Sequence, residues 1–267
     1  MIKKHIVLFD MDGTLTEPRM PFQKKLLGPL RKLSANAEIG ILTGSDFDYL
    51  HQQMNLIIRF SELRFVTHLL PCNGTKHYYP PRLPDDVYKL IHEMNMETFL
   101  GKNCYKQLIM LLSSGQEEMC HYDFPLTGHF ISCRGSMVNW SPVGRNATTE
   151  QRQQFIECDL SYSPSLRERE INKLKYRINL RCAKNVTVKL GGETSFDIYP
   201  TGWDKTYALR HFPEHICWFV GDRCGPNGND KEIYDLLSQE NRAYCTKDPD
   251  NTVEIIQDII RRIGNGE

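Results

Sequence analysis

Short apolar runs that end in polar or glycine-containing turns alternate with helical patterns over the first 75 residues. Three such runs predict buried strands, at 6–9, 39–42 and 65–70. Leu27, Leu30 and Leu33 are spaced three apart and predict an amphipathic helix between the first two runs. A second helix is expected from Asp46, which can cap it, to Met54. This β-α-β-α-β order is typical of a parallel sheet whose ligands bind beyond the carboxyl ends of its strands.

The pattern changes at the proline-rich stretch 80–84, which predicts a stiff connector. A helical pattern follows from Asp85 to about Ser114, and further helices are expected to open at Thr148 and Ser163. The strands expected in this part are two within 129–140 and two more at 186–190 and 194–199. Helices mixed with antiparallel hairpins indicate a separate α+β domain.

Alternation of strands and helices resumes in the last part of the chain. The strands expected there are 216–220 and one near Tyr244, and the helices are 230–237 and 252–263. The pattern therefore predicts an α/β parallel-sheet core formed by 1–84 and 202–267, with an inserted α+β domain at 85–201.

Asp10 and Asp12 follow the first apolar run directly, and residues two apart in an extended chain point to the same side. Gly13 allows a sharp turn after them. Two carboxylates held this close need a positive partner, either a divalent metal or a shared proton. One aspartate of such a pair can act as a nucleophile while the other moves protons. A solvent-exposed turn is the alternative interpretation.

Asp222 ends the predicted strand at 216–220 in the same way, and a third carboxylate could complete an oxygen site for Mg²⁺ (magnesium). Lys205 begins a predicted helix, where an ordinary solvated lysine is the simplest interpretation. Thr43 resembles a residue at a helix start. Lys205 and Thr43 become candidates for the site only because of the aspartates.

Three arginines of the inserted part, Arg134, Arg145 and Arg152, could bind phosphate, because the guanidinium fork matches phosphate oxygens. Scattered surface charge is the alternative. Ser195 and Asp197 share one strand face, and a hydroxyl with a carboxylate suits sugar hydroxyls. An exposed strand face would explain the same two residues.

Charge and cysteine content narrow the function classes for this chain of 267 residues. Lys+Arg and Asp+Glu are both 33, so the formal net charge is zero. This balance speaks against a dedicated nucleic-acid or anionic-membrane surface. The nine cysteines contain no C-x-x-C pair, and we see no signal peptide and no membrane span. We therefore expect reduced thiols and a cytoplasmic location, with no nucleic-acid or membrane partner.

Four motifs, FDMDGT, LTGSD, GWDK and GD…GND, resemble in order those of the haloacid-dehalogenase-like (HAD) superfamily. SPVGR, Glu150-Gln151-Arg152 and GGETSFDIYPTGWDK further resemble the eukaryotic α-phosphomannomutase family, and the resemblance runs from about residue 5 to 265. It implies a HAD-like Rossmannoid core with an inserted α+β cap domain that carries an antiparallel sheet.

The resemblance also implies residue roles. Asp10 matches the nucleophile and Asp12 the general acid/base, while Lys205, Thr43 and Ser45 match groups that position the phosphoryl group. Mg²⁺ would be held by the Asp10 carboxylate, the Asp12 carbonyl and Asp222. The implied sugar-phosphate contacts are Arg19, Arg134, Arg145, Arg152, Ser195 and Asp197.

The implied reaction interconverts mannose 6-phosphate and mannose 1-phosphate through an aspartyl phosphate, with a hexose 1,6-bisphosphate activator, and supplies GDP-mannose synthesis. A homodimer through the cap is also implied. The alternatives are a phosphoglucomutase, a phosphatase acting on sugar phosphates or hexose bisphosphates, and a non-catalytic sugar-phosphate-binding regulator. The four residues that argue against the regulator are Asp10, Asp12, Lys205 and Asp222.

Three stretches depart from the family pattern. TGHFISCRGSM stands where the family has RGTFIEFRNGM, and Cys72 replaces a glutamate. The second structural cation loop expected after Asp230 is altered at 234–237. These changes could shift substrate preference or the flux to hydrolysis.

Overall fold

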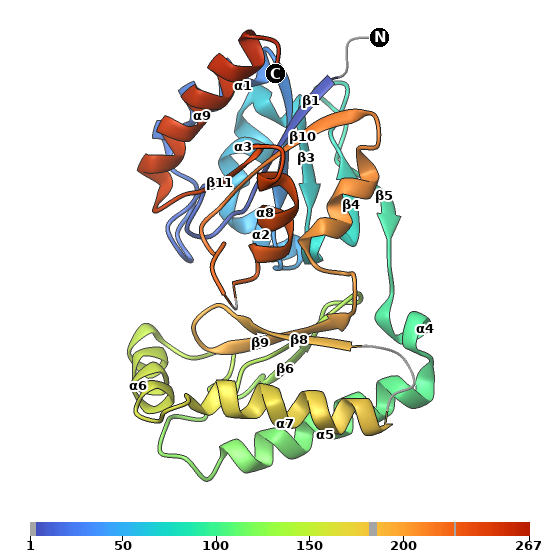
Figure 1. The fold of residues 1–267 in the computed structure, drawn as a ribbon, viewed down its shortest axis with the longest axis vertical. Helices are drawn as coiled ribbons and strands as arrows, with labels where there is room; N and C mark the ends of the chain where they lie inside the picture. The colour runs from blue at the N-terminus through green and yellow to red at the C-terminus, as the bar shows by residue number, and fades with distance from the viewer. Residues whose placement is uncertain (1–3, 182–185, 227) are drawn as a thin grey trace. The chain divides into compact units, whose positions relative to one another are not determined.

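The structure is a computed structural model that describes residues 4–181, 186–226 and 228–267. It divides into two compact units (Figure 1). Met1–Glu93 and Trp203–Glu267 form the core unit, and Met94–Gly202 forms the inserted unit. The core unit therefore extends past the expected boundary at 84.

The extension of the core unit is due to strand β5 (Lys89–Glu93), which pairs antiparallel with β4 (Lys76–Tyr79). The helix expected from Asp85 is therefore wrong over this strand. Helix begins only with α4 (Met96–Leu100) and α5 (Lys102–Met119).

The described strands of the core unit form one seven-stranded sheet in the order β11-β10-β1-β2-β3-β4-β5. Its parallel strands are β1 (Lys4–Phe9), β2 (Ala37–Leu42), β3 (Thr67–Leu70), β10 (His215–Gly221) and β11 (Ala243–Cys245). Strand β1 lies between β10 and β2, so Val7 is paired with both Trp218 and Ile39. The predicted parallel sheet is present, and β4 and β5 extend it.

Helices cover both faces of this sheet, which explains why β1 is apolar at consecutive positions. Val7 and Phe9 pack into one cluster, and Ile6 and Leu8 pack into the other. The first cluster includes side chains of α1 (Leu27–Ser34), α3 (Asn55–Phe60) and α9 (Pro249–Gly264). The second includes α8 (Lys231–Ser238) and the 3₁₀ helix η4 (Lys205–His211). The other described helices of this unit are α2 (Phe47–Gln53), η1 (Lys24–Leu26), η2 (Glu62–Phe65) and η3 (Cys72–Gly74).

The inserted unit has an antiparallel sheet in the order β6-β7-β9-β8. Its strands are β6 (Ile131–Cys133), β7 (Val138–Trp140), β8 (Val186–Gly191) and β9 (Ser195–Pro200), and its remaining helices are α6 (Thr149–Leu160) and α7 (Leu166–Arg181). Helices α5 and α7 run along one face (Figure 1). The rings of Trp140 and Phe196 stack there with centroids 4.6 Å apart, and Trp140 Nε1 donates to Gln116 Oε1 at 2.8 Å. Among the described residues, no helix combines the length and apolarity needed to cross a membrane.

Candidate active site

Three parallel strands end at one edge of the core sheet, and each is followed by a predicted site residue. Asp10 follows β1, Thr43 follows β2, and Asp222 follows β10. The Asp10 N–H donates to the carbonyl of Val220 at 2.8 Å, which fixes the end of β1 against β10. The sheet order therefore brings together carboxylates that are more than 200 residues apart in the chain.

Lys205 is fully buried and its ammonium pairs with Oδ1 of both Asp10 and Asp230. It is placed by the start of η4, where Asp204 caps the helix by accepting the Thr206 N–H at 2.9 Å. Buried charges are tolerated when they are paired in this way. The simplest interpretation of Lys205 from sequence, a solvated helical lysine, is wrong.

Burial and mutual charge shift the titration of this cluster. Burial raises the pKa of Asp10 well above its ordinary value, and Lys205 opposes that rise. Burial alone would lower the pKa of Lys205, but Asp10 and Asp230 together raise it. Burial, followed by the charge of Asp230, raises the pKa of Asp222 to about 6. Titratable groups perturbed by both burial and specific partners are typical of functional sites.

The carboxylates of Asp10, Asp222 and Asp230 offer oxygens that all lie within 4.8 Å of one another. Asp222 Oδ1 is buried, and no described residue bonds to it. Gly13, at φ +82°, permits this close approach, because a Cβ there would lie 2.3 Å from Asp222 Oδ2. Hard carboxylate oxygens with unused capacity fit a divalent cation.

Asp230 is a functional residue that sequence reasoning missed. Its Oδ1 binds Lys205, and its Oδ2 accepts the Arg223 N–H at 3.0 Å. Both oxygens are thus committed to protein groups, which makes Asp230 the anchor of Lys205. The available signal was its place in the GND segment, which the family resemblance included as a motif without giving Asp230 a role of its own.

Asp12 is half-buried, and its Oδ1 accepts the Arg19 N–H at 3.0 Å and the Tyr49 hydroxyl at 3.2 Å. Arg19 itself is exposed in this loop. At the end of β2, the Thr43 hydroxyl accepts the Ser45 N–H at 3.1 Å. These hydrogen bonds hold Asp12, after β1, and Thr43, after β2, in defined turns.

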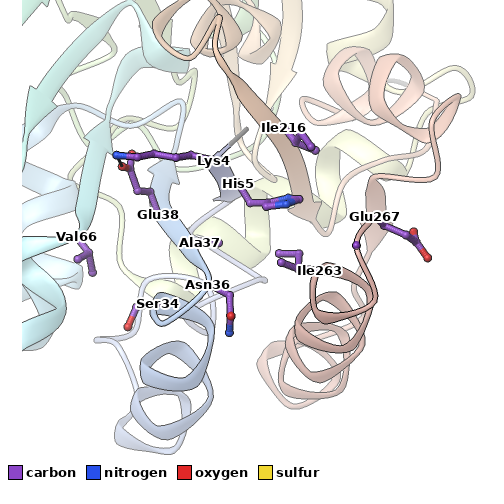
Figure 2. A pocket seen from close by; sticks show the side chains of 11 residues that line it. Lys4, His5, Ser34, Asn36, Ala37, Glu38, Val66, Ile216, Ile263 and Glu267 are labelled. Carbon is purple, nitrogen blue, oxygen red and sulfur yellow. Dashed lines mark ion pairs between the residues drawn. The ribbon is translucent and has the colours of Figure 1, made fainter. Parts of the chain in front are cut away.

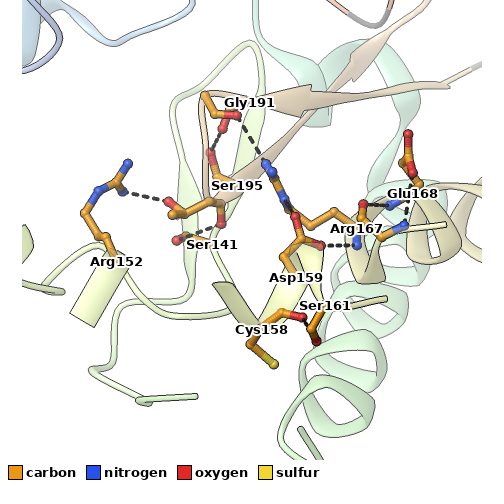
Figure 3. A network of polar contacts seen from close by, with 12 residues as sticks. Ser141, Arg152, Cys158, Asp159, Ser161, Arg167, Glu168, Gly191 and Ser195 are labelled. Atoms are coloured by element: carbon orange, nitrogen blue, oxygen red, sulfur yellow. Dashed lines mark hydrogen bonds and ion pairs between the residues drawn. The ribbon is translucent and has the colours of Figure 1, made fainter. Parts of the chain in front are cut away.

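The other predicted contacts belong to the inserted unit. Arg134 is buried in the β6–β7 hairpin. The side chains of Arg145, Ser195 and Asp197 all bond to Asn139, a residue that the sequence did not single out. Arg152 lies in α6 and donates to Thr194 Oγ1 at 2.7 Å, next to Ser195 (Figure 3).

A surface hollow lies at the opposite ends of the core strands from these acids. Lys4, His5, Ala37 and Ile216, near the amino ends of β1, β2 and β10, are among the residues that line it (Figure 2). None of the predicted site residues lines this hollow. It is therefore separate from the acidic cluster.

Residues 26–262 match a family model described as eukaryotic phosphomannomutase. A phosphomannomutase of Dendrobium officinale is 34% identical, and the match covers 93% of this chain and 91% of the relative. A phosphomannomutase of Drosophila melanogaster is also 34% identical, with 96% and 95% covered.

Solved structures resemble the fold. IMP-bound IMP-nucleotidase of Plasmodium falciparum matches with TM-score 0.65 at 10% identity, over 97% of this chain and 68% of that one. Trehalose-6-phosphate phosphatase of Aspergillus fumigatus matches with TM-score 0.52 at 16% identity, over 97% and 93%. At such identities the likeness concerns the fold alone, and it confirms the expected HAD-like α/β class with an inserted unit.

Proposed function

The chain belongs to the eukaryotic phosphomannomutase family, and on that premise we propose that it interconverts mannose 6-phosphate and mannose 1-phosphate. The observation that carries the proposal is the buried cluster in which Lys205 pairs with Asp10 and Asp230. The cluster orients one carboxylate oxygen of Asp10 by an ion pair. Such positioning is what phosphoryl transfer chiefly requires of a protein.

In the first half-reaction, an oxygen of the Asp10 carboxylate attacks phosphorus and the bond from phosphorus to the sugar oxygen breaks. Asp12, protonated at this stage, gives its proton to that leaving oxygen. Lys205 offsets negative charge on Asp10 and on the phosphoryl group. Thr43 and Ser45, in the turn after β2, help to position the phosphoryl group. The product is an aspartyl phosphate and a free sugar hydroxyl.

In the second half-reaction, Asp12 takes the proton of an incoming sugar hydroxyl, whose oxygen attacks the phosphorus of the aspartyl phosphate. The bond from phosphorus to the Asp10 oxygen breaks, which regenerates the Asp10 carboxylate and releases a sugar phosphate. A hexose 1,6-bisphosphate activator supplies the phosphoryl group of the first turnover and can present either end. The groups proposed to hold the non-reacting phosphate and the sugar hydroxyls are Arg19, Arg134, Arg145, Arg152, Ser195 and Asp197. Support for them is the family resemblance together with the burial of Ser195 and Asp197 on one strand.

We also propose that the enzyme uses Mg²⁺, held by the Asp10 carboxylate, the Asp12 carbonyl and Asp222. The buried Oδ1 of Asp222, which receives no bond from the described residues, supports this proposal. When bound, the ion supplies positive charge to the phosphoryl oxygens. Asp230 is excluded from the proposed set because Lys205 and the Arg223 N–H take both of its oxygens.

The cellular role that we propose is the supply of mannose 1-phosphate for GDP-mannose synthesis in the cytosol, by a homodimer. Eight described cysteines are free thiols, which fits a reducing compartment.

Exposed apolar side chains on α5 and α7, such as Met110 and Tyr176, support an interface on the inserted unit. Sedimentation equilibrium should give twice the chain mass, and a monomer would contradict the dimer.

One assay tests the activity against its alternatives. Purified protein receives mannose 1-phosphate, Mg²⁺ and a trace of hexose 1,6-bisphosphate, and both mannose 6-phosphate and inorganic phosphate are measured. We expect isomerisation with little free phosphate. Stoichiometric phosphate release would favour a phosphatase, and faster conversion of glucose 1-phosphate would favour a phosphoglucomutase. Glu62→Gln, which alters an exposed acid paired with Arg31, serves as the control that keeps activity.

A further inference from the structure

We propose that Asn139 is a positioning residue that orders the sugar-binding side chains of the inserted unit. The inference rests on the proposed function, because it assigns Arg145, Ser195 and Asp197 to substrate. Asn139 lies in β7 and is 2% exposed. It sits directly opposite Asp197 of β9 in the strand register.

One amide group contacts all three of these side chains. Nδ2 of Asn139 donates to Asp197 Oδ1 at 2.7 Å and to Ser195 Oγ at 3.1 Å, with the Phe196 carbonyl at 3.3 Å. Oδ1 of Asn139 accepts from Arg145 Nη1 at 3.4 Å. An amide can donate and accept at the same time without carrying a charge, which a carboxylate or an ammonium cannot do.

The direction of these hydrogen bonds determines whether Ser195 and Asp197 can accept hydrogen bonds from a ligand. Because Asn139 donates to one oxygen of Asp197, that carboxylate is held as a hydrogen-bond acceptor. The Ser195 hydroxyl donates to the Gly191 carbonyl across β9 and β8 (Figure 3), so its oxygen also remains an acceptor. Ser195 and Asp197 are thereby set to receive hydrogen bonds from sugar hydroxyls.

Arg145 lies on the opposite side of the amide and contributes donors. Asn139 therefore separates an acceptor pair, suited to hydroxyls, from a guanidinium, suited to phosphate oxygens. A ligand with hydroxyls next to a phosphate satisfies both sides together. The arrangement identifies the recognised class as a phosphorylated polyol or sugar.

Gly191 fixes the Asp197 carboxylate from the other side. A Cβ at Gly191 would lie 2.8 Å from both Cγ and Oδ2 of Asp197. The carboxylate thus packs against the backbone of β8 while Asn139 holds its Oδ1. These contacts leave Asp197 little freedom of rotation, which favours a preorganised binding group.

The apolar packing of the unit does not depend on the Asn139 side chain. Successive strand residues point to opposite faces, and Val138 and Trp140, its chain neighbours, are the buried apolar residues of β7. Trp140 stacks on Phe196, whereas Asn139 bonds to the alternate residues Ser195 and Asp197. A change at Asn139 is therefore expected to act on binding more than on packing.

A double-mutant cycle tests the inference. Asn139→Ala, Asp197→Ala and the double variant are compared with the wild type by the Kd for mannose 1-phosphate, from calorimetry, and by kcat and KM. Loss of a hydrogen bond to a charged group predicts that Asn139→Ala weakens binding and kcat/KM by about 10- to 100-fold, mainly through KM. In the Asp197→Ala background the same change should cost less than in the wild type, because the contact of Asn139 to Asp197 is already absent and only its other contacts remain to be lost.

Ser113→Ala is the matched control, because Ser113 is exposed on α5, the helix that packs on the face of Trp140 and not on the face of Asn139. It should leave Kd and KM unchanged. Additive losses in the cycle would assign Asn139 a purely structural effect and overturn the inference. Unchanged binding in Asn139→Ala would do the same.

A second variant covers the case in which Asn139→Ala does not fold. Asn139→Asp keeps the shape of the side chain but replaces the donor by a negative oxygen facing Asp197. We expect it to bind mannose 1-phosphate at least about tenfold more weakly than the wild type at neutral pH. Wild-type affinity in this variant would overturn the inference.

Failure of the inference is distinguishable from failure of the proposed function. A wild type that binds mannose 1-phosphate without isomerising it overturns the function, and the calorimetric cycle still decides the role of Asn139. A wild type that isomerises, with an additive cycle, overturns only the role of Asn139. A wild type that does not bind mannose 1-phosphate overturns both.

Discussion

Lys205 determines the charge balance of the candidate site. One ammonium faces two carboxylates in a region closed to solvent, so the trio of Asp10, Asp230 and Lys205 has an excess negative charge. Asp222 adds a further acid nearby. Burial first, and then this excess of neighbouring negative charge, raises the pKa of Asp10 and of Asp222 above that of an ordinary aspartate. The excess charge also predicts an affinity for cations.

Replacing Asp10 with Asn should abolish turnover and preserve the fold. The amide cannot act as the nucleophile, so we expect a loss of at least about a thousandfold in kcat. Lys205 keeps Asp230 as a partner, so the change leaves no uncompensated buried lysine. The kcat of the mutase reaction and the melting temperature are measured, with Glu62→Gln as control. Activity above one-tenth of wild type would refute Asp10 as nucleophile.

The effect of magnesium on stability should depend on pH. In the metal-free protein, the pKa of Asp222 is raised from 3.8 to about 6, so the protonated form stabilises the fold at low pH. That contribution is lost as pH rises through about 6. Because a cation binds the ionised carboxylate, magnesium should raise Tm more at about pH 7.5 than at about pH 5.

Thermal unfolding with EDTA or with Mg²⁺, at both pH values, measures this difference. Asp222→Asn should remove most of the magnesium effect, and Glu62→Gln, at an exposed acid paired with Arg31, should retain it. An equal shift in Tm at the two pH values would contradict the expectation.

The sequence identified residues whose side-chain type and local pattern indicate chemistry. It missed residues whose role depends only on their position in the fold. Asp10 and Asp222 stand out because each acid follows an apolar run. Asp230 directly precedes α8 at its N-cap position and so resembles an ordinary helix start. Asn139 is a polar residue in a short strand, and two of its partners, Ser195 and Asp197, lie more than 50 residues away. Only the β7–β9 register shows what it bonds to.

Among the elements, the hairpin of β4 and β5 shows where local patterning is insufficient. Leu90 and Ile91 are adjacent and exposed in β5, so the strand lacks the alternation of a half-buried strand. Its structure comes from pairing with β4 at the sheet edge, which no short sequence window contains. The internal strands β1, β2 and β10 were predictable because burial on both faces demands apolar runs.

A histidine cluster ties β3 and β4 to η4 and should make the protein sensitive to acid. His68 Nδ1 lies 2.8 Å from His77 Nε2, and His211, in η4, bonds to the Gly74 carbonyl. Burial first, and then the charge of His211, lowers the pKa of His77 from 6.5 to about 3. The stability that neutral His77 contributes is present above pH 6.5 and is lost as pH falls toward 3.

His77→Gln should therefore flatten the pH dependence. Urea unfolding between about pH 6.5 and about pH 4 should show a slope smaller by up to about 1.4 kcal/mol per pH unit, the value for one proton. His121→Gln, at an exposed position, should leave the slope unchanged. An unchanged slope in the His77 variant would refute the assignment.

At the scale of the whole molecule, the inserted unit is one continuous stretch with its own apolar core. Trp140 and Phe196 stack inside it, and Phe155 is also fully buried. We expect residues 94–202 to fold alone. Trp140 is the only tryptophan in this range, so its emission reports directly on the fold. Emission typical of buried tryptophan and a cooperative urea transition are expected, and a gradual change would contradict independent folding.

Strand β1 has a consequence for how the chain is made. It lies in the middle of the core sheet, and Val7 must pair with Trp218 as well as with Ile39. During translation β1 leaves the ribosome before the other strands of the core sheet, yet its neighbour β10 emerges only after the whole inserted unit. One side of β1 keeps unpaired backbone groups during that interval, which favours aggregation. The nascent chain is therefore expected to need chaperone protection until residues 203–267 have been synthesised.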